Sequence, residues 1–380
     1  MARPDSEKFL LKDHLFNRKK VQQMADELDR AYSKFQKKAF IEEVLAGFRQ
    51  RELKARITWM AQCLQKHLPS DYRKAIPIIV KALPAPSDPA LSDDDFGDFI
   101  YAPYGEFVAR YGCKEQYLEI SLDAIYEITT RFSAEDCIRY FINSFPEETI
   151  KVLKRWSKDS HYHIRRLCSE GLRPRLPWAG KINISIKEAL PVLDQLYSDR
   201  TRYVTRSVAN HINDISRVDP TLAMNTLQRW KKSGKQNEKE MDFIIRHGLR
   251  SLIKEGNPRA MEILGYSPNP KVKLSDLKLL KKVKLGSSLE FSFNLKSTSR
   301  ESLIVDFIIH FRNKAGELKG SKVFKLKSLV LERNETVLIE KKHPMRANMT
   351  TRTIYPGKHS LEIQINGKSF GRYPFTILRN

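Results

Sequence analysis

Acidic residues are scarce in this chain of 380 residues compared with basic ones. Forty-five Asp and Glu residues stand against 68 Lys and Arg, which gives a formal net charge of +23 and a pI of about 9.7. A surplus of this size indicates a polyanionic partner, most often a nucleic acid. It does not say whether that partner is bound, cut or repaired.

Cysteine is also rare, with four residues that lie far apart and form no CxxC pair: Cys63, Cys113, Cys137 and Cys168. This usage excludes a disulfide framework and indicates a reducing compartment. His161 and His163 have an HxH spacing, but no cysteine or carboxylate lies at metal-ligand spacing from both. We therefore expect no metal site.

Several sequence signals are missing. No run of about 18 apolar residues predicts a membrane span, and the first 13 residues have no apolar core typical of a secretory signal. The sequence contains no P-loop, no GxGxxG and no nucleophile elbow, so we expect neither a nucleotide cofactor nor a hydrolase triad. A hydrophobic fraction of 41% and the length instead predict a folded chain of two or three domains.

Residues 1–265 show the spacing of amphipathic helices. Apolar side chains recur three and four positions apart, which is the period of one buried helical face. The clearest stripes are Val21, Met24 and Leu28; Leu53, Ile57, Met60, Leu64 and Leu68; and Val204, Val208, Ile212 and Ile215.

An acidic, proline-containing stretch interrupts the helical part between Pro84 and Phe99. It predicts a solvated loop. Because its carboxylates repel phosphate, we expect it to lie away from any DNA face.

The helical part contains an internal repeat. Arg166, Arg206 and Arg246 are each 40 residues apart, and each precedes an apolar helical continuation. A helix pair that repeats at this period is typical of HEAT or armadillo-type solenoids. One arginine per repeat predicts a basic stripe suited to a phosphate backbone. The alternative is that these arginines only bond a neighbouring repeat.

After Gly265 the period changes to two. The linker signal Ser267-Pro268-Asn269-Pro270 precedes alternating apolar residues, and Asn366-Gly367 is a strong signal for a two-residue hairpin turn. About seven short strands predict an immunoglobulin-like β-sandwich over residues 271–380. This segment holds 23 basic and 9 acidic residues, a net charge of +14, so the rest of the chain carries only +9.

The densest group of chemically capable residues lies in His161–Lys181. A predicted helix through Arg165–Leu167 ends near Gly171, since glycine favours the left-handed conformation common at helix ends. The following segment, Arg173–Trp178, is stiffened by prolines on both sides of Arg175. Loops of fixed geometry are frequent sites of function.

These residues carry a family resemblance. The segment Arg165–Ala179 resembles the signature of AlkC-type DNA alkylation repair glycosylases, as do Thr130–Arg139, Arg206–Ile215 and, in the β part, Thr351-Arg352 and Tyr355–His359. The resemblance spans about residues 35–375. The chain departs from the expected pattern after Glu135, where Asp136, Cys137 and Tyr140 stand in place of Phe, Ala and Pro.

The resemblance implies a fold and an activity. The fold would be an α-helical HEAT-like repeat solenoid, residues 1–265, followed by a basic immunoglobulin-like β-sandwich, residues 271–380, that clamps DNA. The activity would be excision of cationic N3-alkylated bases, 3-methyladenine and 3-methylcytosine, without a deep base-flipping pocket. The implied catalytic residues are Glu135, Glu170, Trp178 and Asp214. The predicted DNA contacts are Arg166, Arg173, Arg175, Arg206, Arg246, Arg352 and Lys358.

Physical chemistry gives these residues roles. Loss of a cationic base resembles glycoside hydrolysis, in which carboxylates stabilise an oxocarbenium-like sugar and position water. We expect Glu170 to do this first, with Asp214 and Glu135 beside it. One repeat after Glu170 is Asn210, and Asp214 lies one turn further, which predicts a shared face. Trp178 would hold the cation through its π face.

Each assignment has a structural alternative. Trp178 could be a packing residue, Glu170 an ordinary partner of a nearby arginine, Asp214 a helix end, and Glu135 part of a helix cap with Ser133. For the whole chain the alternative is a HEAT-repeat scaffold or damage sensor that binds nucleic acid without catalysis.

The sequence therefore predicts a monofunctional glycosylase that binds double-stranded DNA with alkylated bases. We expect it to act as a monomer without cofactor or membrane attachment. The resemblance further suggests a cytoplasmic, nucleoid-associated bacterial protein.

Overall fold

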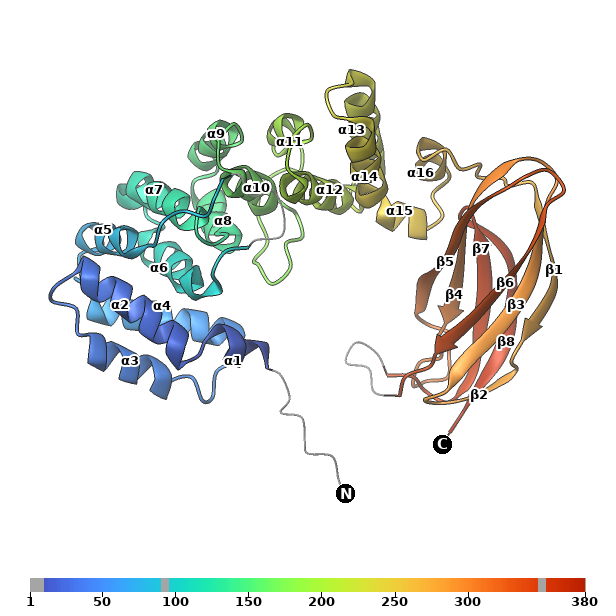
Figure 1. Ribbon diagram of the computed structural model, residues 1–380, viewed down its shortest axis with the longest axis horizontal. Coiled ribbons are helices and arrows are strands. Elements are labelled where there is room, and N and C mark those ends of the chain that lie inside the picture. The colour runs from blue at the N-terminus through green and yellow to red at the C-terminus, as the bar shows by residue number, and fades with distance from the viewer. Residues whose placement is uncertain (1–9, 90–95, 348–352, 380) are drawn as a thin grey trace. The chain divides into compact units, whose positions relative to one another are not determined.

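A computed structural model describes residues 10–89, 96–347 and 353–379 (Figure 1). Arg352 and the aspartates at 93–95 lie outside the described residues. The chain divides into two compact units. One runs to Val218 and includes Arg229–Gly248, and the other consists of Asp219–Gln228 and the residues from Leu249 onward.

Helices precede strands, as the sequence predicts. The change falls between Ile263 and Val272, where the linker signal stands. In chain order the helices are α1 Leu11–Leu15, α2 Arg18–Ala31, α3 Lys37–Ala46, α4 Leu53–His67, α5 Tyr72–Ala82, η1 Phe99–Tyr101, α6 Ala102–Gly112, η2 Glu115–Tyr117, α7 Leu118–Thr129, α8 Glu135–Ser144, α9 Pro146–Trp156, α10 Tyr162–Gly171, α11 Leu190–Leu196, α12 Arg202–Ser216, α13 Pro220–Ser233, α14 Glu238–Gly248, α15 Arg250–Lys254 and α16 Pro258–Ile263. None of the helices in the described ranges is long and apolar enough to cross a membrane.

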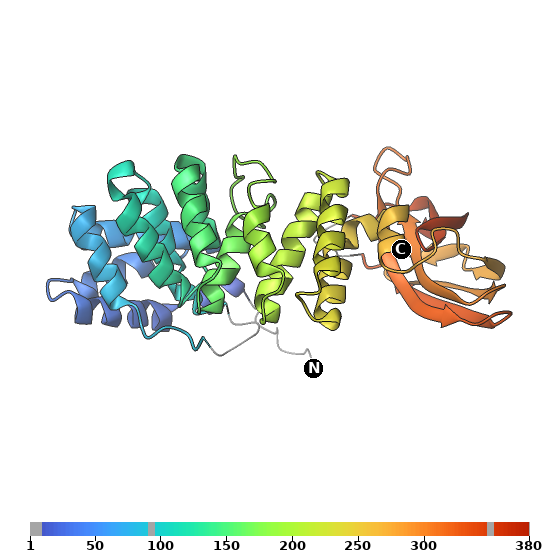
Figure 2. The ribbon, with the colours of Figure 1, turned by 90° about the horizontal axis from the view of Figure 1, so that it is seen from above.

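The helical unit is built of two layers (Figure 1). Along one layer α4, α6, α8, α10, α12 and α14 contact each other in turn, and α5, α7, α9 and α11 lie in the other layer. Figure 2 shows the helices side by side in sequence order. Arg166, Arg206 and Arg246 lie in α10, α12 and α14, three successive helices of the first layer. The predicted 40-residue helix-pair repeat is therefore present.

The predicted apolar stripes are buried between the helices, with one exception. In α12 the predicted stripe is fully buried, and in α4 Met60 and Leu64 have no exposed surface. Leu53 and Ile57, at the start of α4, are only half-buried. The first two turns of α4 thus present apolar surface that the described residues do not completely cover.

Helix α10 is buried over its whole length. It contacts α7, α8, α9, α11 and α12. The helix ends at Gly171 as predicted, but the predicted left-handed conformation is wrong, since Gly171 is not among the described residues with positive φ. A Cβ atom on Gly171 would lie 2.6 Å from Cγ2 of Ile138. Glycine stands here because α10 approaches α8 closely.

The second unit contains two β-sheets whose facing residues form one apolar core. One sheet has the strand order β1-β3-β6, and the other has the order β2-β8-β7-β4-β5. The strands are β1 Val272–Leu279, β2 Lys282–Lys284, β3 Ser288–Ser297, β4 Glu301–His310, β5 Ser321–Leu331, β6 Thr336–Pro344, β7 Gly357–Ile365 and β8 Lys368–Leu378. The predicted β-sandwich is confirmed, with eight strands in the described residues instead of about seven.

The predicted hairpin at Asn366-Gly367 joins β7 to β8. Ile365 pairs with Lys368, and both turn residues have positive φ, 47° for Asn366 and 81° for Gly367. Two consecutive residues in this region define the turn that suits the twist of antiparallel strands.

Candidate active site

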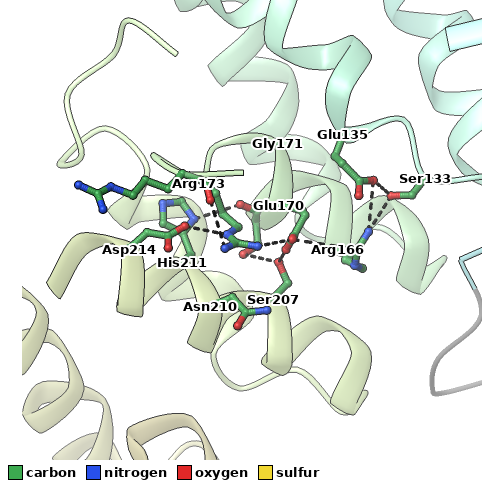
Figure 3. A network of polar contacts seen from close by, with 12 residues as sticks. Ser133, Glu135, Arg166, Glu170, Gly171, Arg173, Ser207, Asn210, His211 and Asp214 are labelled. Atoms are coloured by element: carbon green, nitrogen blue, oxygen red, sulfur yellow. Dashed lines mark hydrogen bonds and ion pairs between the residues drawn. The ribbon is translucent and has the colours of Figure 1, made fainter. Parts of the chain in front are cut away.

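Five charged side chains from α8, α10, α12 and the loop after α10 form a continuous network (Figure 3). Arg173 donates from Nε to Asp214 (2.9 Å) and from Nη1 to Glu170 (2.6 Å). Arg166 lies 3.7 Å from Glu170 and donates from Nη1 to Glu135 (3.3 Å). The order is Asp214, Arg173, Glu170, Arg166, Glu135. The acids and bases alternate, and acids stand at both ends.

The three acids differ in exposure. The Glu170 and Asp214 side chains are each 6% exposed, whereas that of Glu135 is 22% exposed. Both guanidinium groups are also buried. The network therefore presents its negative charge to solvent mainly at Glu135.

Burial and the arginines act in opposite directions on the acids. Burial opposes ionisation of Glu170, but Arg166 and Arg173 outweigh it and hold the pKa of this carboxyl below its ordinary value. At Asp214 burial is the larger effect and raises the pKa, although Arg173 lowers it. Glu170 is thus the firmly ionised centre of the network.

Neutral groups complete the network. The hydroxyl of Ser207 donates to Glu170 (2.5 Å), and Arg166 donates to the hydroxyl of Ser133 (2.7 Å), which in turn donates to Glu135. The Arg166 guanidinium also contacts two adjoining aromatic rings, 4.6 Å from the centroid of Tyr203 and 5.3 Å from that of Phe96. These contacts fix the arginine that faces Glu135.

His211 lies beside the network and is completely buried (Figure 3). Its Nδ1 is 3.0 Å from the carbonyl oxygen of Ser169, and its Nε2 has no hydrogen-bond partner among the described residues. Burial, reinforced by the charge of Arg173, lowers the pKa of His211 to about 3. A neutral imidazole therefore packs against the charged groups.

The loop that follows α10 is held by α8. Arg139 donates to the carbonyl oxygens of Gly171, Arg173 and Gly180, each at 2.8 Å. Asn143, one turn further along α8, donates to the carbonyl oxygen of Lys181 (2.9 Å). The loop is thus anchored at both ends, in agreement with the rigidity that its prolines predict.

Trp178 stands at the tip of this loop in an unusual conformation. Its φ angle is 66°, and the residue is 68% exposed. A bulky residue with positive φ is sterically costly and is often found at functional sites. The ammonium group of Lys54 donates to the Trp178 carbonyl oxygen and lies 3.5 Å from Asp136. Because most of the indole is exposed, packing does not explain the presence of this tryptophan.

A cavity of about 250 Å³ opens beside these residues. Glu135 and Trp178 both line it, together with apolar side chains of α4, α6 and α8, whereas Glu170 and Asp214 do not. The structure thus divides the four predicted catalytic residues into two groups. Two face the cavity, and two lie in the buried network behind it.

The predicted DNA contacts fall in several places. Arg166 and Arg173 belong to the buried network, while Arg175 is exposed on the anchored loop. Arg246 is exposed and Arg206 half-buried on neighbouring helices. Lys358 is exposed on β7 of the other unit.

The structural alternatives are resolved in part. Glu170 does pair with Arg166 and Arg173, and Arg166 does bond Glu135 of the preceding helix pair. Asp214 does not end its helix, which continues to Ser216, and no side chain caps the start of α8. The predicted shared face of Glu170 and Asp214 is confirmed by their common partner Arg173.

Some residues at the site were not predicted from the sequence. They are Lys54, Phe96, Arg139, Tyr203 and Ser207. Phe96 lies within the acidic stretch between Pro84 and Phe99, which was expected to lie away from any DNA face, yet it lines the cavity and stacks on Arg166. Arg139 and Ser207 stand inside the segments that carry the resemblance, which was the available signal for them. Within the described ranges, no group of three His, Cys, Asp or Glu side chains is placed to hold a metal ion.

The chain is similar to known proteins in sequence, and to one solved structure in fold as well. Residues 273–379 match the family described as the C-terminal Ig-like domain of the uncharacterised protein YhaZ. The uncharacterized protein YhaZ of Bacillus subtilis (strain 168) is 32% identical over 360 residues, which cover 93% of this chain and 96% of YhaZ. The alkylpurine DNA glycosylase AlkC of Pseudomonas fluorescens, solved bound to DNA containing an abasic site analog, matches with a TM-score of 0.86 and 31% identity. This match covers 97% of this chain and 100% of that structure.

The chain belongs to the AlkC family. The resemblance stated from the sequence is therefore confirmed, together with the order of a helical part and an Ig-like domain. Because the AlkC match covers nearly the whole of both chains, the charged network and the anchored loop lie within the shared fold.

Proposed function

We propose that the chain is a monofunctional DNA glycosylase that removes cationic N3-alkylated bases, 3-methyladenine and 3-methylcytosine, from double-stranded DNA and so initiates base excision repair. One observation carries this proposal: a buried charged network ends at a partly exposed carboxylate, Glu135, and shares a cavity wall with an exposed, conformationally constrained Trp178. That AlkC of Pseudomonas fluorescens was solved with DNA containing an abasic site analog supports DNA as the partner.

The reaction uses these groups in a simple way. Water bonds to C1′ of the deoxyribose while the bond from C1′ to the base nitrogen breaks, and the bonding electron pair neutralises the cationic base. The proton that the water loses passes to the Glu135 carboxylate. Because the base departs neutral, no general acid is required.

The network supplies negative charge where the sugar becomes cationic. Preorganised charges of this kind are worth most in sites that exclude water. The sequence placed the water-positioning role first on Glu170, but the structure favours Glu135, because Glu170 has an arginine on each side and does not line the cavity. Glu170 then holds Arg166, the arginine that orients Glu135, and Asp214 holds Arg173.

Trp178 supplies selectivity. A cation over an indole face gains about 0.5–2 kcal/mol, whereas a neutral base gains less. The constrained loop holds the indole in place before the substrate arrives, so that little ordering entropy is lost on binding.

We further propose that the enzyme has no lyase step. Lys54 is the lysine that lines the cavity, but its ammonium group already contacts Asp136 and the Trp178 carbonyl oxygen. Borohydride added during the reaction should trap no covalent protein–DNA adduct. A trapped adduct that disappears in a Lys54→Met variant would show a lyase step.

The direct test is release of free 3-methyladenine and 3-methylcytosine from methylated duplex DNA by the purified protein. Free base above the spontaneous rate, with a matching number of abasic sites, supports the proposal. Tight DNA binding without abasic sites would favour the non-enzymatic scaffold or damage sensor.

The same preparations would test the proposed monomeric state by light scattering and the proposed lack of a cofactor by metal analysis. Imaging of the tagged protein in a bacterial host would test the proposed cytoplasmic, nucleoid-associated location.

A further inference from the structure

The cavity beside Glu135 has an apolar interior that the proposed excision of methylated bases does not need. Leu53 and Ile57 of α4, Phe99 of η1 and Ile128 at the end of α7 are among its walls. Leu53 and Ile57 continue a stripe whose later members are fully buried, yet both are only half-buried. Apolar surface left open in this way is typical of a binding site.

Three exposed aromatic side chains surround this interior. Phe96 is 51%, Tyr140 49% and Trp178 68% exposed, and all three line the cavity. Every other Phe, Tyr and Trp in the described ranges is buried or half-buried. Tyr140 stands at one of the positions where the chain departs from the family pattern. Such clustering indicates recognition of a planar or cationic ring.

The cavity is lined by charged side chains as well as by the apolar ones. Glu135 contributes a partly exposed carboxylate. Two further carboxylates at the cavity are already paired, Asp136 with Lys54 and Glu106 with Arg110. Carboxylates and aromatic faces together favour a cation, while the interior favours an apolar group. The fitting ligand is therefore amphipathic and carries a cationic ring with an apolar substituent.

We propose that the cavity receives the N3 substituent of the cationic base, and that the chain excises bases whose substituents are much larger than methyl. This inference rests on the proposed glycosylase function. An apolar cavity of about 150 Å³ is large enough to bind benzene. The cavity here measures about 250 Å³, so that a benzyl group fits, whereas a methyl group leaves most of the space empty.

The test compares three substrates that differ only in the substituent. Duplex DNA is alkylated with methyl-, butyl- or benzyl-nitrosourea, and release of the matching 3-alkyladenine by excess enzyme is followed by mass spectrometry against an enzyme-free control. The wild-type chain should release 3-benzyladenine at a rate within about tenfold of that for 3-methyladenine.

Filling the cavity should remove this tolerance. Ala102, the first residue of α6, lines the cavity. Ala102→Leu and Ala102→Phe should lower the benzyl-to-methyl rate ratio stepwise, by about tenfold or more for Phe. Matched controls are Ala39→Leu and Ala39→Phe, because Ala39 is exposed on α3 and does not line the cavity. These controls should leave the ratio unchanged.

The outcomes separate the two proposals. Release of 3-methyladenine without 3-benzyladenine by the wild type would overturn the cavity assignment and leave the glycosylase function standing. An unchanged ratio in folded Ala102 variants would overturn it as well. If Ala102→Phe does not fold, the ratio for Ala102→Leu decides. Release of neither base would overturn both proposals.

Discussion

The guanidinium group of Arg166 lies 3.3 Å from the carboxylate of Glu135 and holds this acid at the open end of the charged network. The same guanidinium lies 3.7 Å from Glu170 and contacts the rings of Tyr203 and Phe96. Glu135 therefore has a fixed position although it is partly exposed. A carboxylate with these properties can act on a substrate without first reorganising.

Replacement of this carboxylate is the most direct test of its role. Glu135→Gln keeps the shape of the side chain and removes its charge. We expect the single-turnover rate of 3-methyladenine release to fall by about 10²–10³-fold, as for loss of one preorganised electrostatic contact. DNA affinity, measured by fluorescence anisotropy, should stay within about threefold, because the change removes no positive charge.

Asp136→Asn provides the matched control for this variant. Asp136 is the next residue, is exposed and also lines the cavity, but its contact is Lys54 at 3.5 Å instead of the network. Its rate should remain close to that of the wild type. If both variants lose activity equally, general negative charge at the cavity matters and not the network.

Asp214 tests whether the buried end of the network acts through Arg173. Asp214→Asn keeps a hydrogen-bond acceptor for Arg173 but removes the charge. We expect the rate of 3-methyladenine release to fall by about tenfold or more while DNA affinity stays nearly unchanged. The reason is that removing a buried charge changes the electrostatic interactions throughout the network. An equal loss of rate and affinity would indicate a purely structural role for Asp214.

Arg173 should also be a major determinant of stability. Arg173→Ala leaves Glu170 and Asp214 buried without their shared partner, which costs about 3–5 kcal/mol. The free energy of unfolding in urea can be followed by tryptophan fluorescence, since all four tryptophans belong to the helical unit. The control is Arg229→Ala, which breaks the exposed pair with Asp194 and should cost at most about 1 kcal/mol.

The sequence predicted the parts of the structure that repeat or alternate. The stripe of α12 is buried because its apolar spacing matches the helical period, and Asn366-Gly367 forms the hairpin because both residues tolerate positive φ. The acids of the site were predicted through the family resemblance, which depends on local segments. These features are encoded within a few neighbouring residues.

The rest depends on contacts between segments far apart in the chain. Phe96 stacks on Arg166, and Lys54 reaches Trp178 across 124 positions, so neither could be assigned from its own surroundings. Gly171 was assigned a left-handed conformation because glycine commonly ends helices, whereas the close approach of Ile138 is what requires it. The division between cavity-facing and buried acids likewise follows from packing.

His211 predicts a dependence of stability on pH. Its pKa is about 3 in the folded chain, against an ordinary value of 6.5. Below pH 6.5 the unfolded chain binds a proton that the folded chain excludes, so stability falls as the pH falls. At pH 5 this group should cost about 2 kcal/mol relative to pH 7.

The comparison is between the wild type and His211→Gln, unfolded in urea at pH 7 and pH 5 and followed by tryptophan fluorescence. The variant should lose less stability than the wild type between the two pH values, by about 2 kcal/mol. The pKa values of His343 and His359 are also lowered by burial, but both lie in the β unit, which contains no tryptophan. Parallel losses in the two proteins would mean that His211 titrates normally.

The charge of the β-sandwich has two physical explanations that a salt titration separates. Most of its strand lysines lie on the edge strands of the two sheets: Lys273 and Lys278, Lys282 and Lys284, Lys322, Lys325 and Lys327, and Lys341 and Lys342. Lysines at sheet edges prevent pairing with other chains and need no nucleic acid to explain them. Lys358 is different because β7 lies inside its sheet between β8 and β4.

We therefore expect Lys358, and not the lysines of the edge strand β5, to contact phosphate. Lys358→Gln should reduce the slope of log affinity against log salt concentration by about 1, the effect of losing one phosphate contact. Lys327→Gln, on β5, should leave the slope unchanged although it removes the same charge. Equal reductions in both variants would show that the whole basic surface contributes. A slope that changes in neither variant would place the phosphate contacts elsewhere, on exposed arginines such as Arg175 and Arg246 of the helical unit.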